Sequence, residues 1–344
     1  MKVAIAASGT NLDAPTDPRF GRCPCLVIVD TETMDFEAVD NIAAAQGSGA
    51  GIAANSMSED RIPQYQPKQS CESGGGNQEF EEQEQRLRER TASIRHQILR
   101  LSGKGGVGKS TVAANLAWAL ALRDLRTGLL DADINGPSIP LMTGLKGIGP
   151  SGRGGFKAVP VMEQLKVMSM SFFFDDPDTP TIRRGPLKGG IIRRFIADVE
   201  WGPLDYLVVD LPPGTGDEPL TVAQAFPAAD GGIIVTAPQE ASVAVCRKAV
   251  NFLKAVKLPC LGVIENMSGF ACPHCTEVTN VFSAGGGEAM AREMGIPFLG
   301  RLPLSPEVVA LTDHGQPLLG AAASPGLREA FGTVVRNLLP KCAR

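Results

Sequence analysis

The sequence predicts an α/β fold in which helices cover both faces of a parallel, mostly seven-stranded sheet, preceded by a small truncated α/β segment. From about His96 onward, short strands of nearly unbroken Val, Ile and Leu alternate with helical segments, which is the pattern of βαβ units. The composition agrees, because 43% of the 344 residues are hydrophobic, only 5% are aromatic and 39 are glycine. The expected strands are Ile98–Leu101, Thr127–Leu130, Leu165–Met170, Tyr206–Val209, Gly232–Thr236, Cys260–Ile264 and Pro297–Gly300.

The N-terminal segment, residues 1–56, is expected to form a small unit of its own. Strand-like stretches occur at Met1–Ala7 and Leu26–Val29, on either side of a turn-rich stretch. A glycine-rich run at 47–51 is a candidate start of a helix. A chain of this length has room for such a unit beside one large α/β domain.

A connecting region, residues 57–92, separates this unit from the large domain at 93–344. Its first part is polar, contains Pro and Gly and lacks periodicity, as linkers do. Over 78–95, apolar residues recur every seven positions and acidic residues precede basic ones by four. This pattern predicts an amphipathic helix that lies against the large domain. The recurring apolar residues are Phe80, Leu87 and Ile94.

The charge balance argues against several classes of partner. A formal net charge of -4 gives no basic surface for nucleic acid, and no run of like charges suggests a membrane surface. The chain has no apolar stretch of membrane-spanning length, and the apolar run at its start is shorter than a signal-peptide core. We therefore expect a cytoplasmic protein without membrane or nucleic-acid partners.

The eight cysteines point to metal or redox chemistry, because disulfides rarely persist in a reducing compartment. Cys246 and Cys260 lie in apolar contexts and are expected in the core. Cys272 and Cys275 lie three positions apart in a loop after a strand, so both sulfurs can reach one metal. One chain supplies only two such ligands, and four-thiolate coordination therefore needs a twofold partner. Half a zinc ribbon and a redox dithiol are the alternatives, and His274 is expected to be a turn residue.

A phosphate-binding loop follows the strand Ile98–Leu101 directly. The pattern G-x-x-x-x-G-K-[ST] spans Gly103–Ser110 and precedes a helical segment, which is the context that the motif requires. Its glycines allow consecutive N–H groups to face an anion, and the helix N-terminus adds favourable potential. Lys109 is expected to reach the β- and γ-phosphates of ATP, and Ser110 to ligate Mg2+. The expected nucleotide contacts in the loop are Gly103, Lys104, Gly105, Gly106, Val107, Gly108, Lys109, Ser110 and Thr111.

Carboxylates follow two of the expected strands. Asp131 and Asp133 come after Thr127–Leu130, and Asp210 comes after Tyr206–Val209. Because ligands of parallel sheets bind at the carboxyl ends of the strands, these groups can hold Mg2+ or orient the attacking water. Helix capping is the alternative for Asp131 or Asp133 alone, and the division of work between them stays open. The expected Mg2+ ligands are Ser110, Asp131 and Asp210, and the catalytic candidates are Lys104, Lys109, Asp131, Asp133 and Asp210.

Four motifs, in this order, resemble those of P-loop ATPases: the first resembles the MinD/ParA/Mrp group, and the other three resemble Mrp proteins in particular. They are G-K-G-G-V-G-K-S, D-A-D-x-x-G-P-S-x-P, V-D-x-P-P-G-T-G-D and E-N-M-S-G-F-x-C-P-H-C. The resemblance implies a P-loop NTPase with a deviant Walker A motif, in which the second and third motifs are switches that sense the γ-phosphate. In that group the extra lysine, here Lys104, reaches the partner's nucleotide across a face-to-face dimer. The resemblance also makes Asn266 and nearby Pro303 candidates for contacting the base, although turn chemistry explains Asn266 nearly as well.

The last of these motifs most closely resembles the Mrp/ApbC family, in which the two cysteines bridge a 4Fe-4S cluster between two subunits. The resemblance covers about residues 93–340. It implies an ATP-dependent iron–sulfur cluster carrier, a homodimer that hydrolyses ATP and transfers its cluster to apoproteins. The identity of the recipients, and whether ATP drives loading or release, stay open. A MinD/ParA-like positioning ATPase and a non-enzymatic scaffold for molybdenum or iron cofactors are the alternative functions.

Residues 1–56 resemble the opening half of the dinitrogenase iron-molybdenum cofactor-binding family, as in NifX-like proteins. The resemblance rests on F-G-R-C-P and on the following V-D-T-E-T-M-D-F-E-A-V-D-N, and the second half of that small domain is missing. Cys23 and Cys25 are candidate metal ligands, with a structural role equally open. Cys71 is the one cysteine of the linker, which speaks against a second permanent cluster there.

Overall fold

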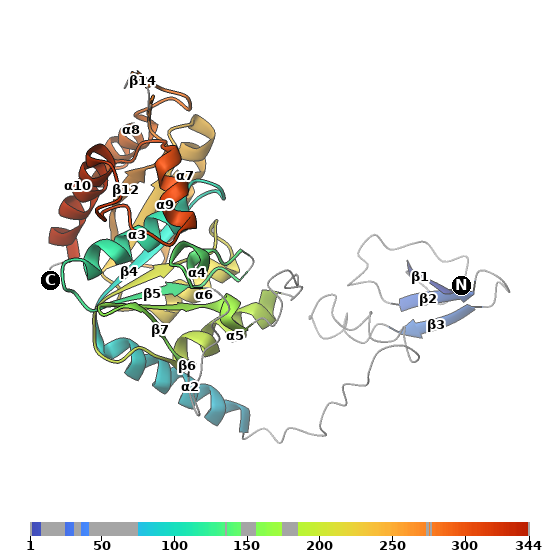
Figure 1. Cartoon of the computed structure of the whole chain (residues 1–344). Helices are drawn as coiled ribbons and strands as arrows, with labels where there is room; N and C mark the ends of the chain where they lie inside the picture. Colours follow the sequence, from blue (N-terminus) through green and yellow to red (C-terminus); the bar gives the residue numbers. More distant parts are fainter. Residues whose placement is uncertain are drawn as a thin grey trace. The chain divides into compact units, whose positions relative to one another are not determined.

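The chain divides into two compact units, with the boundary between Glu72 and Ser73 (Figure 1). The first unit contains a three-stranded sheet, and the second contains a large sheet with its helices. The computed structural model describes residues 2–7, 25–30, 36–40, 75–134, 136–145, 156–173, 185–272, 275 and 277–342.

The sheet of the first unit is antiparallel and includes both predicted strands plus a third. Val27 and Val29 alternate with more exposed positions and are buried on one face of the middle strand. The predicted helix start at 47–51, together with Cys23 and Cys71, lies outside the described residues. The strands, in spatial order, are β1 (Lys2–Ala7), β2 (Cys25–Asp30) and β3 (Phe36–Asp40).

Within the described residues the large sheet has eight strands, of which seven are parallel and overlap the seven predicted ones. The eighth, β7, pairs antiparallel with β8 at one edge. Its sequence VPVM is short and contains a proline, which edge strands tolerate and which hides the strand pattern. In spatial order the strands are β15 (Phe298–Arg301), β12 (Cys260–Glu265), β11 (Gly231–Thr236), β4 (Ile94–Ser102), β10 (Leu204–Asp210), β5 (Thr127–Asp131), β8 (Leu165–Ser169) and β7 (Val159–Met162).

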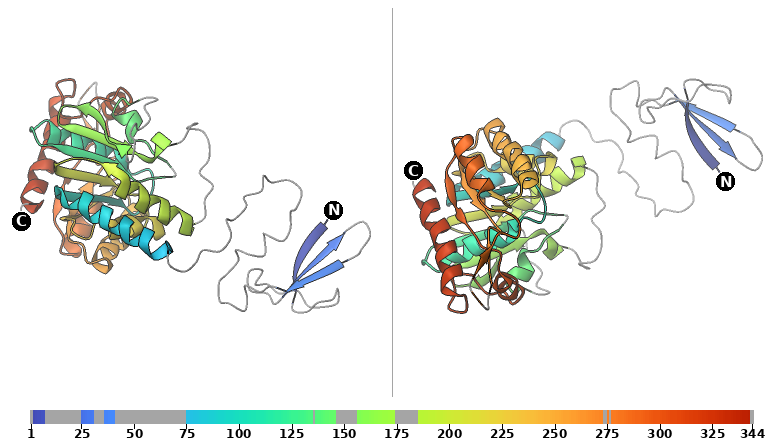
Figure 2. Two further views of the ribbon diagram at one scale, coloured as in Figure 1. Left: turned by 90° about the horizontal axis from the view of Figure 1, so that it is seen from below. Right: turned by 90° about the horizontal axis from the view of Figure 1, so that it is seen from above.

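Helices cover both faces of this sheet, as predicted (Figure 2). Neighbouring strand residues such as Ile98 and Leu99 belong to two different hydrophobic clusters, because successive side chains of a strand point to opposite faces. One cluster includes α2 (Gly75–Ala92), α5 (Gly185–Asp198), α6 (Asp217–Ala225), α7 (Glu240–Ala255) and α8 (Gly286–Glu293). The other includes α3 (Lys109–Ala121), α4 (Ile139–Met142), α9 (Pro306–Asp313) and α10 (Pro325–Cys342).

Short elements complete the second unit. Two small pairs of strands form outside the main sheet, one parallel and one antiparallel. These elements are β6 (Phe156–Lys157), β9 (Val199–Glu200), β13 (Phe270–Ala271), β14 (Val278–Thr279) and the 3-10 turn η1 (Met170–Phe173). Within the described ranges, no helix is both long and apolar enough to cross a bilayer.

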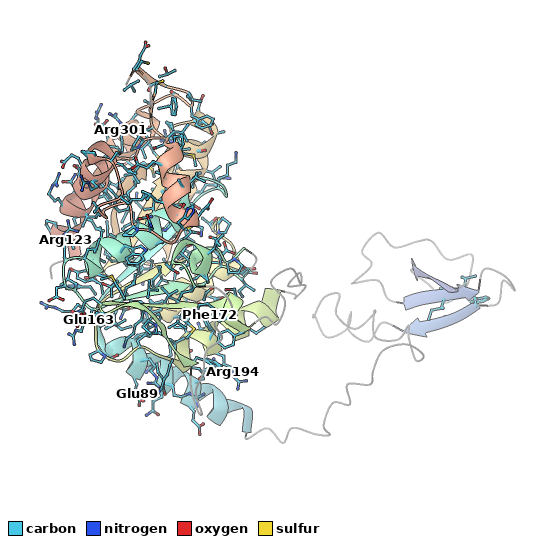
Figure 3. All side chains as sticks on the ribbon, viewed as in Figure 1. Glu89, Arg123, Glu163, Phe172, Arg194 and Arg301 are labelled. Carbon is cyan, nitrogen blue, oxygen red and sulfur yellow. The ribbon has the colours of Figure 1, made fainter. Side chains whose placement is uncertain are left out.

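Helix α2 begins three residues before the predicted 78–95 and ends earlier, so the prediction was wrong at its C-terminal end. Ile94 is instead the first residue of β4, and its side chain joins the same buried cluster as Leu87. The acidic and basic residues of α2 pair across to α5: Glu84 contacts Arg193, and Arg86 Nε lies 3.8 Å from Asp198 Oδ1. The outward faces of the two helices carry polar residues, among them Glu89 and Arg194 (Figure 3).

Candidate functional site

The phosphate loop connects β4, a central strand, to α3, and lies at the carboxyl edge of the sheet. Gly106 and Gly108 have left-handed φ values of 79° and 78°, which favour glycine. Gly108 is the N-cap of α3, and no side chain caps this helix. The first N–H groups of α3 are therefore placed to receive an anion, which fits a bound phosphate. Ser110 and Thr111 lie half-buried in that first turn.

The loop is held from both sides by close contacts, with the backbone of α7 on one side and the side chain of Asn266 on the other. A Cβ on Gly103 would lie 2.6 Å from the carbonyl carbon of Val245 in α7. A Cβ on Gly108 would lie 2.2 Å from Nδ2 of Asn266, which donates to the Val107 carbonyl at 2.9 Å. Gly103 is thus required by space, whereas Gly108 is favoured by its left-handed φ and by the nearby amide of Asn266.

Replacing Gly108 with alanine is expected to lower the melting temperature. The left-handed conformation costs a non-glycine residue about 1–2 kcal/mol, and the new methyl group would displace the amide of Asn266 from Val107. Gly105→Ala is the matched control, because an added Cβ there meets nothing within 4 Å. Thermal unfolding followed by tryptophan fluorescence measures both variants, and equal melting temperatures would contradict the expectation.

The phosphate-loop lysine contacts two of the three predicted carboxylates. Lys109 Nζ donates to Asp210 Oδ1 at 3.0 Å and lies 3.8 Å from Asp133 Oδ2. All three side chains are largely buried, since the lysine is 7% exposed and Asp210 is fully buried. The fold therefore gathers these residues from α3, from β10 and from the segment after β5.

A further cation, Arg100, lies beneath this cluster and was missed by the sequence analysis. Arg100, Asp210 and Asp131 are in register on the neighbouring strands β4, β10 and β5. The Arg100 side chain is fully buried, and its Nη2 donates to Asp210 Oδ1 at 2.6 Å. Burial lowers the pKa of the guanidinium to about 10, against the opposing effects of the two carboxylates. Asp210 therefore carries two cationic partners on one oxygen.

The second oxygen of Asp210 is available for a further ligand. Within the described part of the chain, Asp210 Oδ2 is buried without a hydrogen-bond partner, as are Nε and Nη1 of Arg100. Buried carboxylate oxygens rarely stay unsatisfied, and a metal ion or its water satisfies such an atom. The donor set at this position therefore fits a Mg2+ ion.

Asp131 anchors the segment that follows β5. Its two oxygens accept bonds from the Asp133 and Ile139 backbone N–H groups, at 3.2 and 3.3 Å, and from Ser169 Oγ at 3.1 Å. Burial, followed by the charge of Asp210, raises the pKa of Asp131 to about 8. Asp131 is therefore bound into the protein on both oxygens, whereas Asp133 lies nearer to Lys109.

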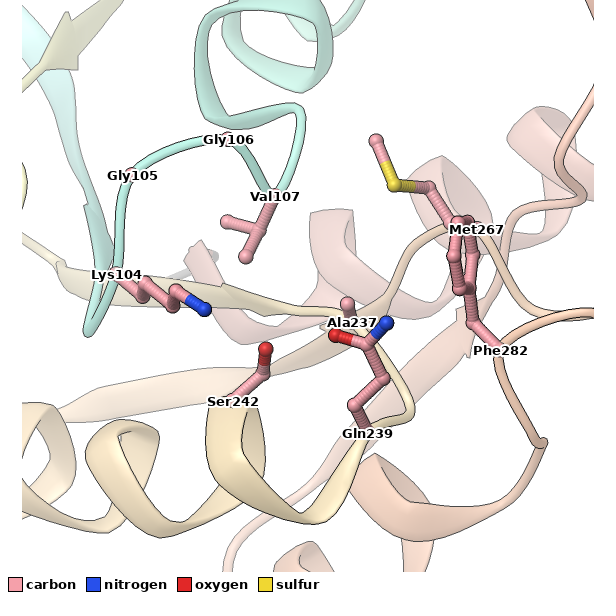
Figure 4. Close-up of a pocket in the computed structure, with 9 residues that line it drawn as sticks. All are labelled: Lys104, Gly105, Gly106, Val107, Ala237, Gln239, Ser242, Met267 and Phe282. Carbon is pink, nitrogen blue, oxygen red and sulfur yellow. The ribbon is translucent and has the colours of Figure 1, made fainter.

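Lys104 is exposed, unlike Lys109, and lines a pocket of about 150 Å3 beside the phosphate loop (Figure 4). Gln239 and Ser242 from the start of α7 form one side of this pocket, and Met267 and Phe282 form another. The residues around the cysteine pair thus border the phosphate loop directly. Of the two base-contact candidates, Asn266 bonds to the loop, and Pro303 lies half-buried after β15.

The cysteine pair lies on the β13–β14 hairpin. Cys272 directly follows β13, and its backbone N–H donates to the Glu277 carbonyl at 3.0 Å. Cys272 is half-buried and Cys275 is exposed, whereas His274 lies outside the described residues. Considering only the described residues, no group of three or more His, Cys, Asp or Glu is placed to hold a metal ion.

Cys25 begins β2, and three further cysteines, whose side chains the structure describes, have other surroundings. Cys246 is fully buried in α7, as predicted, and burial raises its pKa. Cys260 is half-buried beside the core, with a pKa raised to about 11 by burial. Cys342 near the end of α10 is fully buried. Raised thiol pKa values make cysteines poor nucleophiles and metal ligands, so these residues serve packing.

Comparison with known protein families agrees with this geometry. The family model described as NUBPL iron-transfer P-loop NTPase matches residues 93–339. A second model, described as dinitrogenase iron-molybdenum cofactor, matches residues 1–61.

Curated relatives cover most of the chain. An iron-sulfur cluster carrier protein of Methanocaldococcus jannaschii is 47% identical over 263 residues, which are 76% of this chain and 89% of the relative. The cytosolic Fe-S cluster assembly factor CFD1 of Eremothecium gossypii is 46% identical over 258 residues, 72% of this chain and 92% of the relative.

Solved structures show the same fold. A nucleotide-binding protein from Archaeoglobus fulgidus in complex with ADP has a TM-score of 0.60 and 40% identity, covering 68% of this chain and 91% of its own. The cell division protein MinD of Aquifex aeolicus, with a TM-score of 0.51 and 24% identity, covers 71% and 97% and shares the fold. From residue 93 to residue 339, this chain belongs to the family of NUBPL iron-transfer P-loop NTPases.

Proposed function

We propose that this protein is an ATP-dependent iron–sulfur cluster carrier. Two copies close around bound nucleotide, hold one 4Fe-4S cluster between their Cys272 and Cys275 pairs, and pass it to apoproteins in the cytoplasm. The observation that supports this most is the continuity of the two sites. Asn266 bonds to the phosphate loop. It also begins the loop between β12 and α8, which contains the hairpin with both cysteines. The relatives named as a cluster carrier and as a cytosolic cluster assembly factor support the same function.

Nucleotide binding assigns roles to the cluster of charges. Lys109 leaves Asp210 Oδ1 for the β- and γ-phosphates, and the backbone N–H groups of the loop bind the same phosphates. Ser110 and Asp210 would hold Mg2+, and Asp131, which also fixes the segment after β5, stays a candidate ligand. Arg100 remains at Asp210 throughout, so the carboxylate keeps a buried counter-charge after the lysine has moved. Release of the nucleotide after hydrolysis then returns Lys109 to Asp210.

A dimer supplies the two thiolate ligands that one hairpin lacks. A 4Fe-4S cluster takes four thiolates, and each hairpin offers two. The exposed apolar side chains next to the pair, Val278, Val281 and Phe282, suit a surface that is covered in the dimer. Lys104 lines the same pocket as Phe282. In the dimer, Lys104 reaches the nucleotide of the second copy.

We further propose three regions for the chain: a partial cofactor-binding segment at 1–56, a linker and helix at 57–92, and the ATPase domain at 93–344. The match of residues 1–61 to the dinitrogenase iron-molybdenum cofactor model supports the first region. The contacts of α2 with α5 support a helix that belongs structurally to the ATPase domain.

Anaerobic reconstitution with iron and sulfide tests the carrier function. The wild type is expected to take up about two iron ions per chain and to gain the mass of a dimer, whereas Cys272→Ala/Cys275→Ala takes up almost none. Cys260→Ala is the matched control, because this half-buried thiol lies beside the core. The Cys260→Ala variant is expected to take up as much iron as the wild type. A wild type that binds only zinc, or a double variant that binds as much iron as the wild type, would contradict the proposal.

A further inference from the structure

A buried carboxylate, Glu265, lies between the phosphate loop and the cysteine hairpin. It is the last residue of β12, and its side chain is fully buried. Its Oε1 accepts bonds from Ser268 Oγ at 2.5 Å and from the Gly285 N–H at 2.9 Å, and its Oε2 accepts one from the Gly287 N–H at 2.6 Å. Bonds to an ionised acceptor are about twice as strong as neutral ones.

These partners lie at the two ends of one loop. The loop runs over 266–285, contains the β13–β14 hairpin with both cysteines, and starts directly after Glu265. Ser268 lies near its beginning and Gly285 at its end, so a single carboxylate ties both ends together. Gly287 is in the first turn of α8, where the partial positive charge of the helix also favours a carboxylate.

A cation completes this network from the neighbouring strand. Arg301 Nε, on β15, lies 3.4 Å from Glu265 Oε1, and the same guanidinium contacts Glu288 of α8. Arg301 is 46% exposed and lies at the surface (Figure 3), whereas the Glu265 side chain that it contacts is fully buried. The network therefore fixes the loop to β15 and to α8 at once.

The same short segment contacts the phosphate loop. Asn266, the next residue, donates to the Val107 carbonyl, and Met267 borders the pocket next to Lys104. Ser268 N–H in turn donates to the Leu302 carbonyl at 2.9 Å. The residue that contacts the phosphate loop and the residue that holds both ends of the cysteine loop are thus neighbours in the chain, separated by one peptide unit.

We propose that Glu265 is a positioning residue through which the nucleotide state sets the position of the cysteine hairpin, and thereby the rate at which the cluster leaves. This inference rests on the proposed carrier function. Without the carboxylate, the two ends of the loop lose their common partner, and movements of the phosphate loop no longer reach the hairpin as a unit. The position of the cysteine pair then no longer depends on the nucleotide site.

The test compares iron release from reconstituted full-length dimers to the chelator bipyridyl, with and without MgATP. In the wild type the two rates are expected to differ by about fivefold or more, in either direction. In Glu265→Gln, which keeps the size of the side chain, their ratio falls to about one. In Ser268→Ala the ratio of the two release rates is expected to lie between that of the wild type and one. In Ser268→Thr, which keeps the hydroxyl, the ratio is expected to equal that of the wild type. Glu293→Gln is the matched control, since this carboxylate lies on α8 and pairs with Arg247 at the surface.

Hydrogen exchange in iron-free protein gives a readout that needs no cluster. The amide protons of Gly285 and Gly287 are expected to exchange faster in Glu265→Gln than in Glu293→Gln. Wild-type ratios in both Glu265→Gln and Ser268→Ala would overturn the inference while leaving the carrier function intact. If Glu265→Gln does not fold, the comparison of Ser268→Ala with Ser268→Thr decides. A wild type that binds no iron would refute the carrier function itself and this inference with it.

Discussion

Replacing Lys109 with alanine is expected to abolish nucleotide binding and to reduce ATP hydrolysis by at least about a hundredfold. Lys109 is the one loop lysine whose ammonium group is already buried among the carboxylates, 3.0 Å from Asp210. No other side chain of the loop can bring a charge to the same position, since Lys104 points into the pocket beside the loop. Binding of a fluorescent ATP analogue and release of phosphate measure the two effects.

Lys104→Ala is expected to behave differently. Because this lysine is exposed and we propose that it acts on the nucleotide of the second copy, the variant should bind ATP about as well as the wild type and lose mainly hydrolysis. Lys254→Ala, an exposed lysine in the last turn of α7, serves as the control for loss of charge alone. Hydrolysis at the wild-type rate in Lys104→Ala would contradict a role across the dimer. Retained binding in Lys109→Ala would contradict its assignment to the phosphates.

The sequence was most informative where one local pattern decides the structure. Each of the seven parallel strands contains a short apolar run, and the phosphate loop needs its glycines at fixed positions because Gly108 has a left-handed φ and lies against the amide of Asn266. Strand β7 was missed because its pairing with β8 depends on a hairpin and not on its own periodicity. The end of α2 was misplaced for a related reason. Ile94 packs in the same hydrophobic cluster as Leu87, but it belongs to a strand and not to the helix.

The position of Arg100 beside Asp210 could be recognised only once the strand order was known. In the sequence it is one charge near the end of an apolar strand, which is equally typical of an edge position. In the fold β4 is central, and the register places Arg100 beside Asp210 and within one further strand of Asp131. A usable signal does exist in the chain: an arginine inside an apolar strand that leads into a phosphate loop requires a buried carboxylate on a neighbouring strand. The role of Glu265 was hidden in the same way, because its partners Gly285 and Gly287 are far along the chain.

The buried pair of Arg100 and Asp210 leads to the largest expected effect on stability. Asp210→Ala leaves a fully buried guanidinium without its closest partner, which typically costs about 3–5 kcal/mol of unfolding free energy. Arg100→Met should cost less, because Asp210 still has Lys109 at 3.0 Å. The double variant Arg100→Met/Asp210→Leu is expected to recover much of the loss, since it removes both buried charges and fills their space with apolar atoms.

Chemical denaturation followed by tryptophan fluorescence measures these differences in the ATPase unit alone, because both tryptophans, Trp118 and Trp201, belong to it. Asp205→Ala is the matched control on the same strand: Asp205 also pairs with an arginine, Arg126, but this pair lies at the surface, where water screens it. Its loss should therefore be far smaller. If Asp210→Ala were no less stable than Asp205→Ala, the guanidinium would have found water or Asp131 as a substitute. Arg100 could then not be the fixed counter-charge that allows Lys109 to leave Asp210 for the phosphates.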